Sequence, residues 1–219
     1  MEQKSIQINT ISNNSVRHER ADAVANRQLL LTTAESLFVE RGVADVTMAE
    51  IAQAAGVGKG TLYRRFSNKG DLCLALMDKQ MREFQNNMLA ELRFMAASGM
   101  TSMQQLDYFL NALVSFTAVH MPLLCEVQQA HLLQIQGNTQ QPHFWLYMTV
   151  HGLLKTAVAV GEIPAYLDIA YIADALLSPL RADIFRFQRE VRGFSLERIS
   201  AGLRGLAQRL ILYRDQVSE

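Results

Sequence analysis

The sequence has little proline and little glycine, with 4 and 12 residues of each among 219. Few turn-forming residues favour long helices over a fold with many short elements. Strand signals are missing too, because no stretch alternates apolar and polar residues over six or more positions with β-branched enrichment. We therefore predict an all-α fold, in which a small N-terminal domain is joined to a larger C-terminal helical domain.

Cysteine is scarce as well, and this limits where the protein works. The two cysteines, Cys73 and Cys125, are too few for a secreted disulfide scaffold and indicate reduced thiols. The first 20 residues contain no apolar segment of the kind found in signal peptides. No apolar run approaches the roughly 18 residues that a membrane helix requires. We expect a cytoplasmic protein without a membrane partner.

No charge of either sign is in excess, since the formal net charge is zero. The distribution is more informative than the sum. The run from Ala55 to Gly70 contains four cations and no acid: Lys59, Arg64, Arg65 and Lys69. Such a cluster alone is more often a solvated face than a nucleic-acid site. Its helical context therefore decides between these two interpretations.

Helix signals divide the chain into three parts: a disordered leader or arm over residues 1–20, a first domain over 21–70 and a second over 71–219. A helix is predicted from about Asp22 to Arg41, where Gly42 ends it. Thr47 and Glu50 form a capping-box pattern that begins a short helix over residues 47–54. Gly56 ends that helix, and a second short helix follows over 58–65. Asp71 is expected to cap a long helix that reaches about Ala97.

Two short helices joined by a glycine turn are the arrangement of a helix-turn-helix near residues 47–66. Val57, Leu62 and Phe66 are predicted to anchor the second helix inward. Lys59, Gly60, Tyr63 and Arg64 then share an outward face, flanked by Thr61 and Arg65. Lysine and arginine donate hydrogen bonds to guanine, and threonine and tyrosine donate to phosphate. The segment therefore predicts a DNA-binding element.

Residues 28–72 strongly resemble the DNA-binding domain of TetR-type (tetracycline-repressor-type) regulators. The matching landmarks are Ala34, Leu37, Phe38, Gly42, Thr47, Ile51, Ala52, Ala55-Gly56-Val57, Gly60-Thr61-Leu62-Tyr63, Phe66, Lys69 and Leu72. The resemblance implies that Thr47, Thr61, Tyr63 and Lys69 contact phosphate. It implies that Lys59, Gly60, Arg64 and Arg65 face bases or backbone, although Arg65 departs from the histidine common in the family. An N-terminal arm with Arg17, His18 and Arg20 is a further implied contact.

The C-terminal domain contains an extended region that is almost free of charge. Residues 94–154 include no Lys or Arg and only two acids, Asp107 and Glu126. Helices this poor in charge are buried or line a binding site. The family resemblance places an effector pocket among the helices of this domain. Its candidate residues are Phe109, Phe116, His120, Trp145, Met148 and His151. The alternative is that these side chains are ordinary core. The lack of cations favours a neutral or cationic apolar effector over a polyanion.

Further helices are predicted over residues 102–119, 122–136, 142–160, 165–191 and 195–214, with a kink at Pro179 in the fourth. The last has a heptad spacing of apolar residues, at Leu196, Ile199, Leu203, Leu206, Leu210 and Tyr213. With Leu176, Leu180 and Phe187 of the preceding helix, this seam predicts a homodimer through a four-helix interface. Packing of the same seam inside one chain is the alternative.

These features together predict a ligand-responsive transcriptional regulator that binds a palindromic operator in double-stranded DNA and releases it when a small apolar effector binds. Two alternatives share the helices: an activator of the same fold and a helical-bundle adaptor that binds proteins. An enzyme is not expected, because motifs such as H-E-x-x-H and G-x-S-x-G are missing from the sequence. No cofactor and no metal site are predicted.

Overall fold

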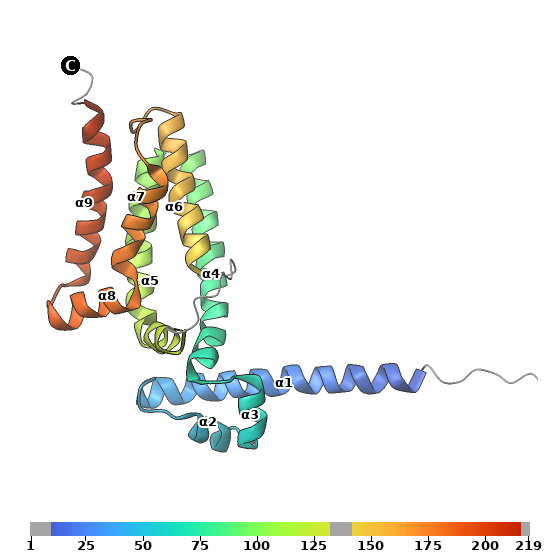
Figure 1. Cartoon of the computed structure of the whole chain (residues 1–219). Coiled ribbons are helices and arrows are strands. Elements are labelled where there is room, and N and C mark those ends of the chain that lie inside the picture. The colour runs from blue at the N-terminus through green and yellow to red at the C-terminus, as the bar shows by residue number, and fades with distance from the viewer. Residues whose placement is uncertain (1–9, 132–141, 216–219) are drawn as a thin grey trace, which may run out of the picture. The chain divides into compact units, whose positions relative to one another are not determined.

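The computed structural model describes residues 10–131 and 142–215 (Figure 1). These residues form helices and contain no strand, so the predicted all-α fold is confirmed. The chain divides into two compact units, Met1–Leu76 and Met77–Glu219. Helix α4 (Lys69–Ala97) begins in the first unit and continues in the second.

The first unit is built from α1 (Thr10–Arg41), α2 (Met48–Ala54) and α3 (Lys59–Arg65). All three helices contribute to one small core, in which the following side chains are buried: Leu30, Leu31, Ala34, Phe38, Met48, Ile51, Ala52, Leu62 and Phe66. Helix α1 ends as predicted at Gly42, whose φ of 87° places it in the left-handed region. The amide of Gly42 donates to the Phe38 carbonyl at 2.9 Å and completes this end.

Helix α1 begins earlier than the sequence predicts, at Thr10 instead of about Asp22. Residues 1–9 of the predicted leader lie outside the described residues, but residues 10–20 are helical. The helix extends this far because each residue added to an existing helix forms one further hydrogen bond. Residues 17–27 include three alanines and three arginines, both strong helix formers.

The second unit contains the rest of α4, followed by α5 (Ser102–His131), α6 (Pro142–Ala159) and α7 (Ile169–Leu177). A 3₁₀ turn (η1, Ser178–Leu180), the short α8 (Ala182–Arg186) and a π-helical turn (η2, Phe187–Val191) come next. Helix α9 (Leu196–Asp215) is the last. Helix α5 is central, because it packs against α6, α8 and α9.

Two prolines act differently from the sequence prediction. Pro122 does not separate two helices but lies inside α5, and the last turns of α5 run in a new direction (Figure 1). A proline removes one hydrogen bond and bends a helix, and packing can offset that cost. Pro179 has the opposite outcome. The predicted helix over 165–191 is not one kinked helix, because Arg181 after the 3₁₀ turn is extended (φ −60°, ψ 141°).

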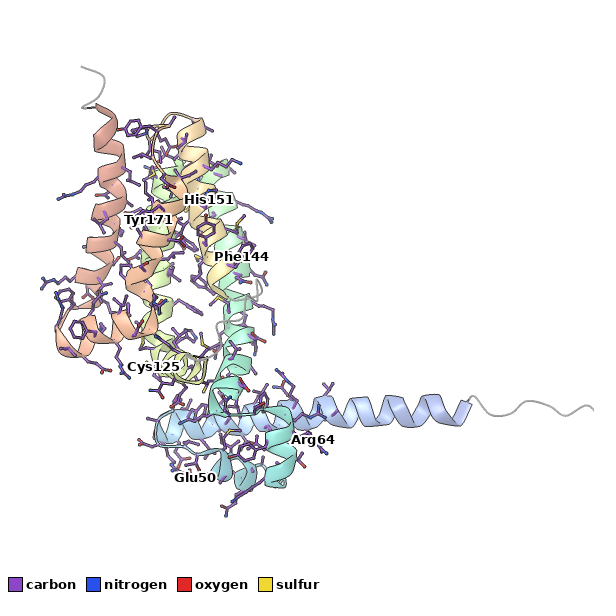
Figure 2. All side chains as sticks on the ribbon, viewed as in Figure 1. Glu50, Arg64, Cys125, Phe144, His151 and Tyr171 are labelled. Atoms are coloured by element: carbon purple, nitrogen blue, oxygen red, sulfur yellow. The ribbon has the colours of Figure 1, made fainter. Side chains whose placement is uncertain are left out.

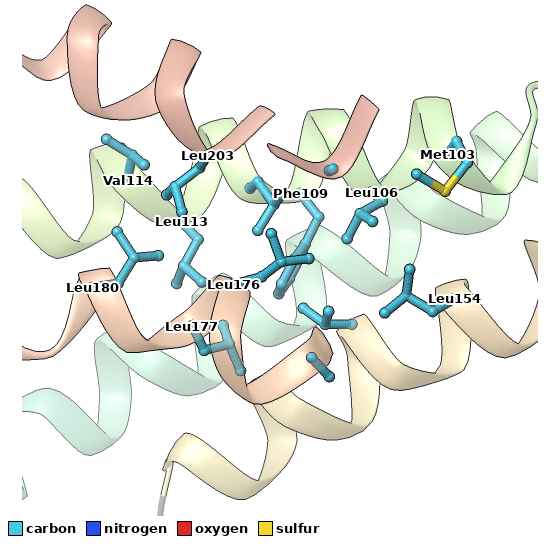
Figure 3. Close-up of a cluster of buried hydrophobic side chains, with 14 of the residues drawn as sticks. Met103, Leu106, Phe109, Leu113, Val114, Leu154, Leu176, Leu177, Leu180 and Leu203 are labelled. Atoms are coloured by element: carbon cyan, nitrogen blue, oxygen red, sulfur yellow. The ribbon is translucent and has the colours of Figure 1, made fainter. Parts of the chain in front are cut away.

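A cluster of apolar side chains fills the interior of the second unit (Figure 3). Leu106, Phe109 and Leu113 of α5 meet Leu176 of α7 and Leu203 of α9 within it. Phe109 has no exposed surface. Complete burial of a side chain of this size contributes about 1.5–3 kcal/mol to folding. The core therefore depends on α5, which explains why this helix carries so little charge.

Polar contacts set the position of α5 relative to its neighbours. The carboxylate of Glu162, in the turn after α6, accepts from the backbone amides of Ser102 (2.9 Å) and Met103 (2.8 Å). These amides have no partner within the helix, and a negative charge is favourable at this end. Farther along α5, Asp107 accepts from Arg204 of α9 at 2.7 Å. The Glu162 contacts thus tie the start of α5 to the turn after α6, and the Asp107 contact ties α5 to α9.

No apolar segment as long as a membrane helix is expected from the sequence, and α5 contains one. Residues Ser102–Ala130 are long and apolar enough to cross a membrane by composition alone, with a mean hydropathy of 1.4. The core helix of a helical bundle meets the same criterion. In α5, 28% of the apolar window is buried, and Leu106, Phe109, Leu110 and Leu113 belong to the core of the second unit.

Candidate DNA-binding and effector sites

The start of α2 has the reciprocal capping contacts that the sequence predicts. The Thr47 amide and the Thr47 hydroxyl each donate to Glu50 Oε2 at 2.7 Å, and the Glu50 amide donates to Thr47 Oγ1 at 3.3 Å. The capping box is therefore confirmed. It has a consequence for the predicted role of Thr47. The single hydroxyl proton is already donated to Glu50, so in this arrangement it does not reach a phosphate.

Sequence reasoning missed a third member of this group, Arg41 at the end of α1. Its Nη2 atom lies 2.8 Å from Glu50 Oε1 and 3.0 Å from the Asp45 carbonyl oxygen. The Thr47 hydrogen bonds, followed by Arg41, lower the pKa of Glu50 from 4.5 to about 2. A basic residue just before a helix-ending glycine was the available signal, but nine positions separate the partners.

Gly56 makes the tight turn between α2 and α3. Its φ is 66°, a conformation that residues with a Cβ atom rarely adopt. The amide of Val57 donates to the Ala52 carbonyl at 3.0 Å, which closes the end of α2. Gly58 then precedes α3 in an extended conformation. This turn lets two short helices follow each other directly, as a helix-turn-helix requires.

Helix α3 has the two faces that the sequence predicts. Leu62 has no exposed surface and Phe66 has 4%, whereas Tyr63 is 49% exposed. The other outward residues, Lys59, Gly60, Arg64 and Arg65, are also exposed, and Thr61 and Val57 are half-buried. Figure 2 labels Arg64 on this helix. The cations and the Tyr63 phenol thus lie on the exposed face of α3, and Leu62 packs on its buried face. The contacts of these residues with DNA stay a prediction.

Lys69 begins α4, and its environment is more enclosed than the sequence suggests. It is half-buried, and its Nζ atom donates to the Ala44 carbonyl at 3.3 Å. The cap of α4 is Asn68 and not the predicted Asp71, because Asn68 Oδ1 accepts from the Asp71 amide at 2.9 Å. Asparagine is as good an N-cap as aspartate, and here it stands one turn earlier.

Four of the six predicted effector residues lie together in the second unit. The Phe109 and Trp145 rings are 5.8 Å apart, and the Phe116 and His120 rings stack at 4.1 Å. Phe84 of α4 joins the two pairs: its ring lies 4.4 Å from Phe116, 6.2 Å from Trp145 and 6.4 Å from Phe109. We call these five residues the aromatic cluster. Phe109 belongs to the core at the same time, so the alternative of ordinary core packing describes it well.

Phe84 was not among the sequence candidates, although a signal for it exists. Buried side chains follow α4 at spacings of three and four residues, at Met77, Met81, Met88, Leu92 and Met95. Phe84 occupies the matching position in that row. The two remaining candidates lie elsewhere on α6. Met148 is 48% exposed, and His151 stacks on Tyr147 at 5.5 Å (Figure 2).

Comparison with known proteins gives a consistent result. The model of the family "Bacterial regulatory proteins, tetR family" matches residues 30–76, which include α2, α3 and the start of α4. The HTH-type transcriptional regulator SAR2658 of Staphylococcus aureus (strain MRSA252) is 30% identical over 180 residues. The match covers 81% of this chain and 90% of that protein. The chain belongs to the TetR family. It is a transcriptional regulator of the helix-turn-helix type.

Solved structures agree on the fold of this TetR-family regulator. The Thermus thermophilus FadR repressor, crystallised with lauroyl-CoA, is 21% identical with a TM-score of 0.62, covering 85% of this chain and 93% of its own. A regulator from Saccharomonospora viridis, crystallised with choline, is 18% identical with a TM-score of 0.63, covering 83% and 95%. At these identities the likeness concerns the fold alone.

The predicted interface residues of the TetR-family chain have two different environments. Leu176, Leu180, Ile199 and Leu203 are at most 9% exposed and pack in the chain's own core. They are closed to a partner chain, as the alternative of packing within one chain requires. Leu196 and Leu210 are half-buried, whereas Phe187 is 47% and Leu206 57% exposed. The side chain of Tyr213 lies outside the described residues, as do those of Arg17, His18 and Arg20.

No group of three or more His, Cys, Asp or Glu side chains that could hold a metal ion occurs among the residues described. Of the two cysteines, Cys73 is buried. Cys125 is half-buried, and its burial raises the pKa of its thiol despite the nearby Arg186.

Proposed function

We propose that this TetR-family regulator is a cytoplasmic homodimeric repressor that releases a palindromic operator when a small apolar effector binds its second unit. The observation that carries the proposal is the pairing of a fully buried Leu62 with an exposed Tyr63 and Arg64 on α3. A short helix held in this way presents a fixed polar face to the major groove.

Each DNA-binding residue predicted in the first unit has a proposed role. Lys59 and Arg64 donate to base edges, and Arg65 lies beside them toward the backbone. Gly60 has open space where a Cβ would be, so the helix can approach the duplex closely. Thr61, Tyr63 and Lys69 donate to phosphates and set the register. Thr47 contributes by holding the start of α2, whose free amides face a phosphate.

The aromatic cluster is the proposed effector region. Its rings come from α4, α5 and α6, so a bound molecule contacts three helices at once. No cation occurs in residues 94–154, which supports a neutral or cationic ligand. Choline in the Saccharomonospora viridis structure is a cation of this kind. The acyl chain of lauroyl-CoA in the Thermus structure is apolar, although that molecule also carries anionic groups.

Dimerisation connects the effector to the operator. Two copies present two α3 helices to half-sites one helical turn apart, roughly 34–36 Å. Phe187 and Leu206 are exposed apolar side chains that a second copy can cover. An effector that favours one arrangement of the two copies shifts the population away from the spacing that fits DNA. Helix α4 joins the recognition element to the aromatic cluster and is the proposed lever.

The test is a selection of duplexes from a random library, followed by fluorescence anisotropy with a labelled operator at several salt concentrations. We expect binding without added effector, and a loss of affinity as salt rises. Mass spectrometry of the natively purified protein identifies the effector, which should then release the operator. Binding only in the presence of effector would support an activator. A protein indifferent to every duplex at low salt would support the adaptor alternative.

A further inference from the structure

Arg27 is an exposed cation of the first unit that has no part in the DNA contacts proposed above. It lies on α1, ahead of the segment 30–76 that matches the family model. Its guanidinium carbon, Cζ, lies 5.6 Å from the centre of the Phe66 ring. Phe66 is the residue at which α3 ends. The contact therefore joins α1 to the end of the recognition helix (Figure 1).

The position of Arg27 on α1 explains this contact. Leu31, Ala34 and Phe38 lie on the buried face of α1, and Arg27 lies one turn before Leu31 in the same row. The row leaves the small core of the first unit at this point. An arginine can cover apolar surface there with its methylene stem while its charged end stays in water. The Phe66 ring, only 4% exposed, lies beneath that charged end.

The charge of Arg27 has no acidic partner within the described part of the chain. One turn away on α1 its neighbours are uncharged: Ala23, Val24, Leu30 and Leu31. Helix α3 contains no acid. Among the residues that the structure describes, no carboxylate forms an ion pair with Arg27. The ring contact uses the face of the guanidinium, so the N–H donors at its edge are available to a partner outside the chain.

The side of α3 next to Phe66 belongs to the proposed DNA face. Tyr63 precedes Phe66 by three residues, so the two side chains are neighbours on the helix surface. Tyr63 is 49% exposed and is proposed to donate to a phosphate. Arg27, above the Phe66 ring, therefore lies close to that contact. A guanidinium presents paired N–H donors that match two phosphate oxygens, which makes a phosphate the partner that fits.

We propose that Arg27, oriented by the Phe66 ring, donates to an operator phosphate beside the one that Tyr63 contacts. This inference rests on the proposed DNA face of α3 and extends that face onto α1. The contact is independent of base sequence, because phosphate contacts set the register of a protein on the duplex and do not read bases. The ring holds the guanidinium in place before DNA arrives, so less side-chain freedom is lost on binding.

The test uses Arg27→Met, which keeps an apolar stem over Phe66 and removes the charge. Fluorescence anisotropy of the full-length protein is measured with the selected operator and with an unrelated duplex, each at several salt concentrations. We expect Arg27→Met to weaken binding of both duplexes by the same factor, roughly tenfold at low salt, and to reduce the slope of log affinity against log salt by about 1. Arg27→Lys keeps the charge and should keep the slope.

The matched control is Arg93→Met, which removes an exposed arginine from α4 and should change neither affinity nor slope. Unchanged binding by Arg27→Met, with normal binding by the wild-type protein, overturns the proposal and shows that the arginine only covers Phe66. A larger loss on the operator than on the unrelated duplex also overturns it, because that result indicates a base contact. A wild-type protein that binds neither duplex overturns the proposed DNA face together with this inference.

A double-variant cycle tests the role of the ring. Phe66→Leu keeps an apolar side chain and removes the aromatic face, and circular dichroism at the assay temperature checks that each variant is folded. We expect Arg27→Met to weaken operator binding less than about threefold in this background. Equal losses with and without the ring overturn the orienting role of Phe66. The phosphate contact itself is decided by Arg27→Met and Arg27→Lys in the wild-type background.

Discussion

Arg41 and Glu50 join the last turn of α1 to the first turn of α2, with Nη2 and Oε1 2.8 Å apart. Both side chains are more than a third exposed. The other carboxylate oxygen holds the Thr47 amide and hydroxyl. An acidic group close to the proposed phosphate contacts would repel DNA if it were left alone. The arginine offsets this charge while it fixes the entry into the helix-turn-helix.

The first prediction concerns pH. The folded-state pKa of Glu50 is about 2, below its ordinary 4.5, so this carboxylate stabilises the fold fully above about pH 4.5. The contribution is lost as the pH falls from 4.5 toward 2. Glu50→Gln should lower the free energy of unfolding at neutral pH and flatten its decline in that window. Urea unfolding followed by circular dichroism at a series of pH values measures this. An unchanged acid profile would contradict it.

The second prediction concerns the anchor of the recognition helix. Leu62 has no exposed surface, and Leu62→Ala leaves a cavity beneath α3. We expect a loss of about 2–5 kcal/mol in the stability of the first unit. Urea denaturation measures this, and operator affinity should fall in parallel. Tyr63→Ala, at an exposed neighbour, is the control and should leave stability nearly unchanged.

The third prediction separates contacts with phosphates from contacts with bases. Tyr63→Ala and Lys69→Ala should weaken binding of all duplexes by similar factors, and Lys69→Ala should also reduce the slope of log affinity against log salt by about 1. Arg64→Ala should cost about 1–3 kcal/mol on the preferred operator and relax its sequence preference. Anisotropy with the operator and single-base variants measures both effects. Identical behaviour of the three variants would refute the assignment.

The fourth prediction concerns the start of α5. Glu162→Gln keeps the shape of the side chain and removes the charge that accepts from two backbone amides. We expect the second unit to lose about 1 kcal/mol. Thermal unfolding provides the measurement, and Glu91→Gln, at an exposed position of α4, is the matched control. Equal effects of the two variants would mean that the cap contributes nothing.

The fifth prediction concerns the dimer. Leu206→Glu places a charge on an apolar side chain that is 57% exposed, and a partner chain would have to bury it. We expect the dimer dissociation constant in analytical ultracentrifugation to rise at least tenfold. Val160→Glu, at a position that is 64% exposed on the end of the α6 region, should leave it unchanged. A Leu206→Glu protein that dimerises normally would exclude this face.

The helix-turn-helix could be predicted in detail because its signals are local. Thr47 and Glu50 are three residues apart, and Gly56 marks its own turn. The spacing of Leu62, Tyr63 and Phe66 then separates the inward from the outward face. Each of these signals acts within one or two helical turns. These signals therefore do not depend on how distant parts of the chain pack.

The second unit was harder to predict, because distant packing decides its details. Pro122 and Pro179 carry the same local signal. Pro122 nevertheless lies within α5, whereas Pro179 lies in the 3₁₀ turn after α7, where the helix ends. The seam of α9 has the spacing of a dimer interface, but Ile199 and Leu203 turn toward α5 of their own chain. Phe84 was missed because its partners, Phe109 and Phe116, follow it by 25 and 32 positions. Periodicity predicts a buried face but not the element that covers it.

Trp145 is the single tryptophan of the chain and lies against Phe84 and Phe109. Its fluorescence therefore comes wholly from the aromatic cluster, and the first unit contributes no tryptophan signal. Emission recorded from the unlabelled protein reports events around those rings alone. A change of wavelength on adding operator would thus show that an event at α3 has reached the aromatic cluster along the proposed lever.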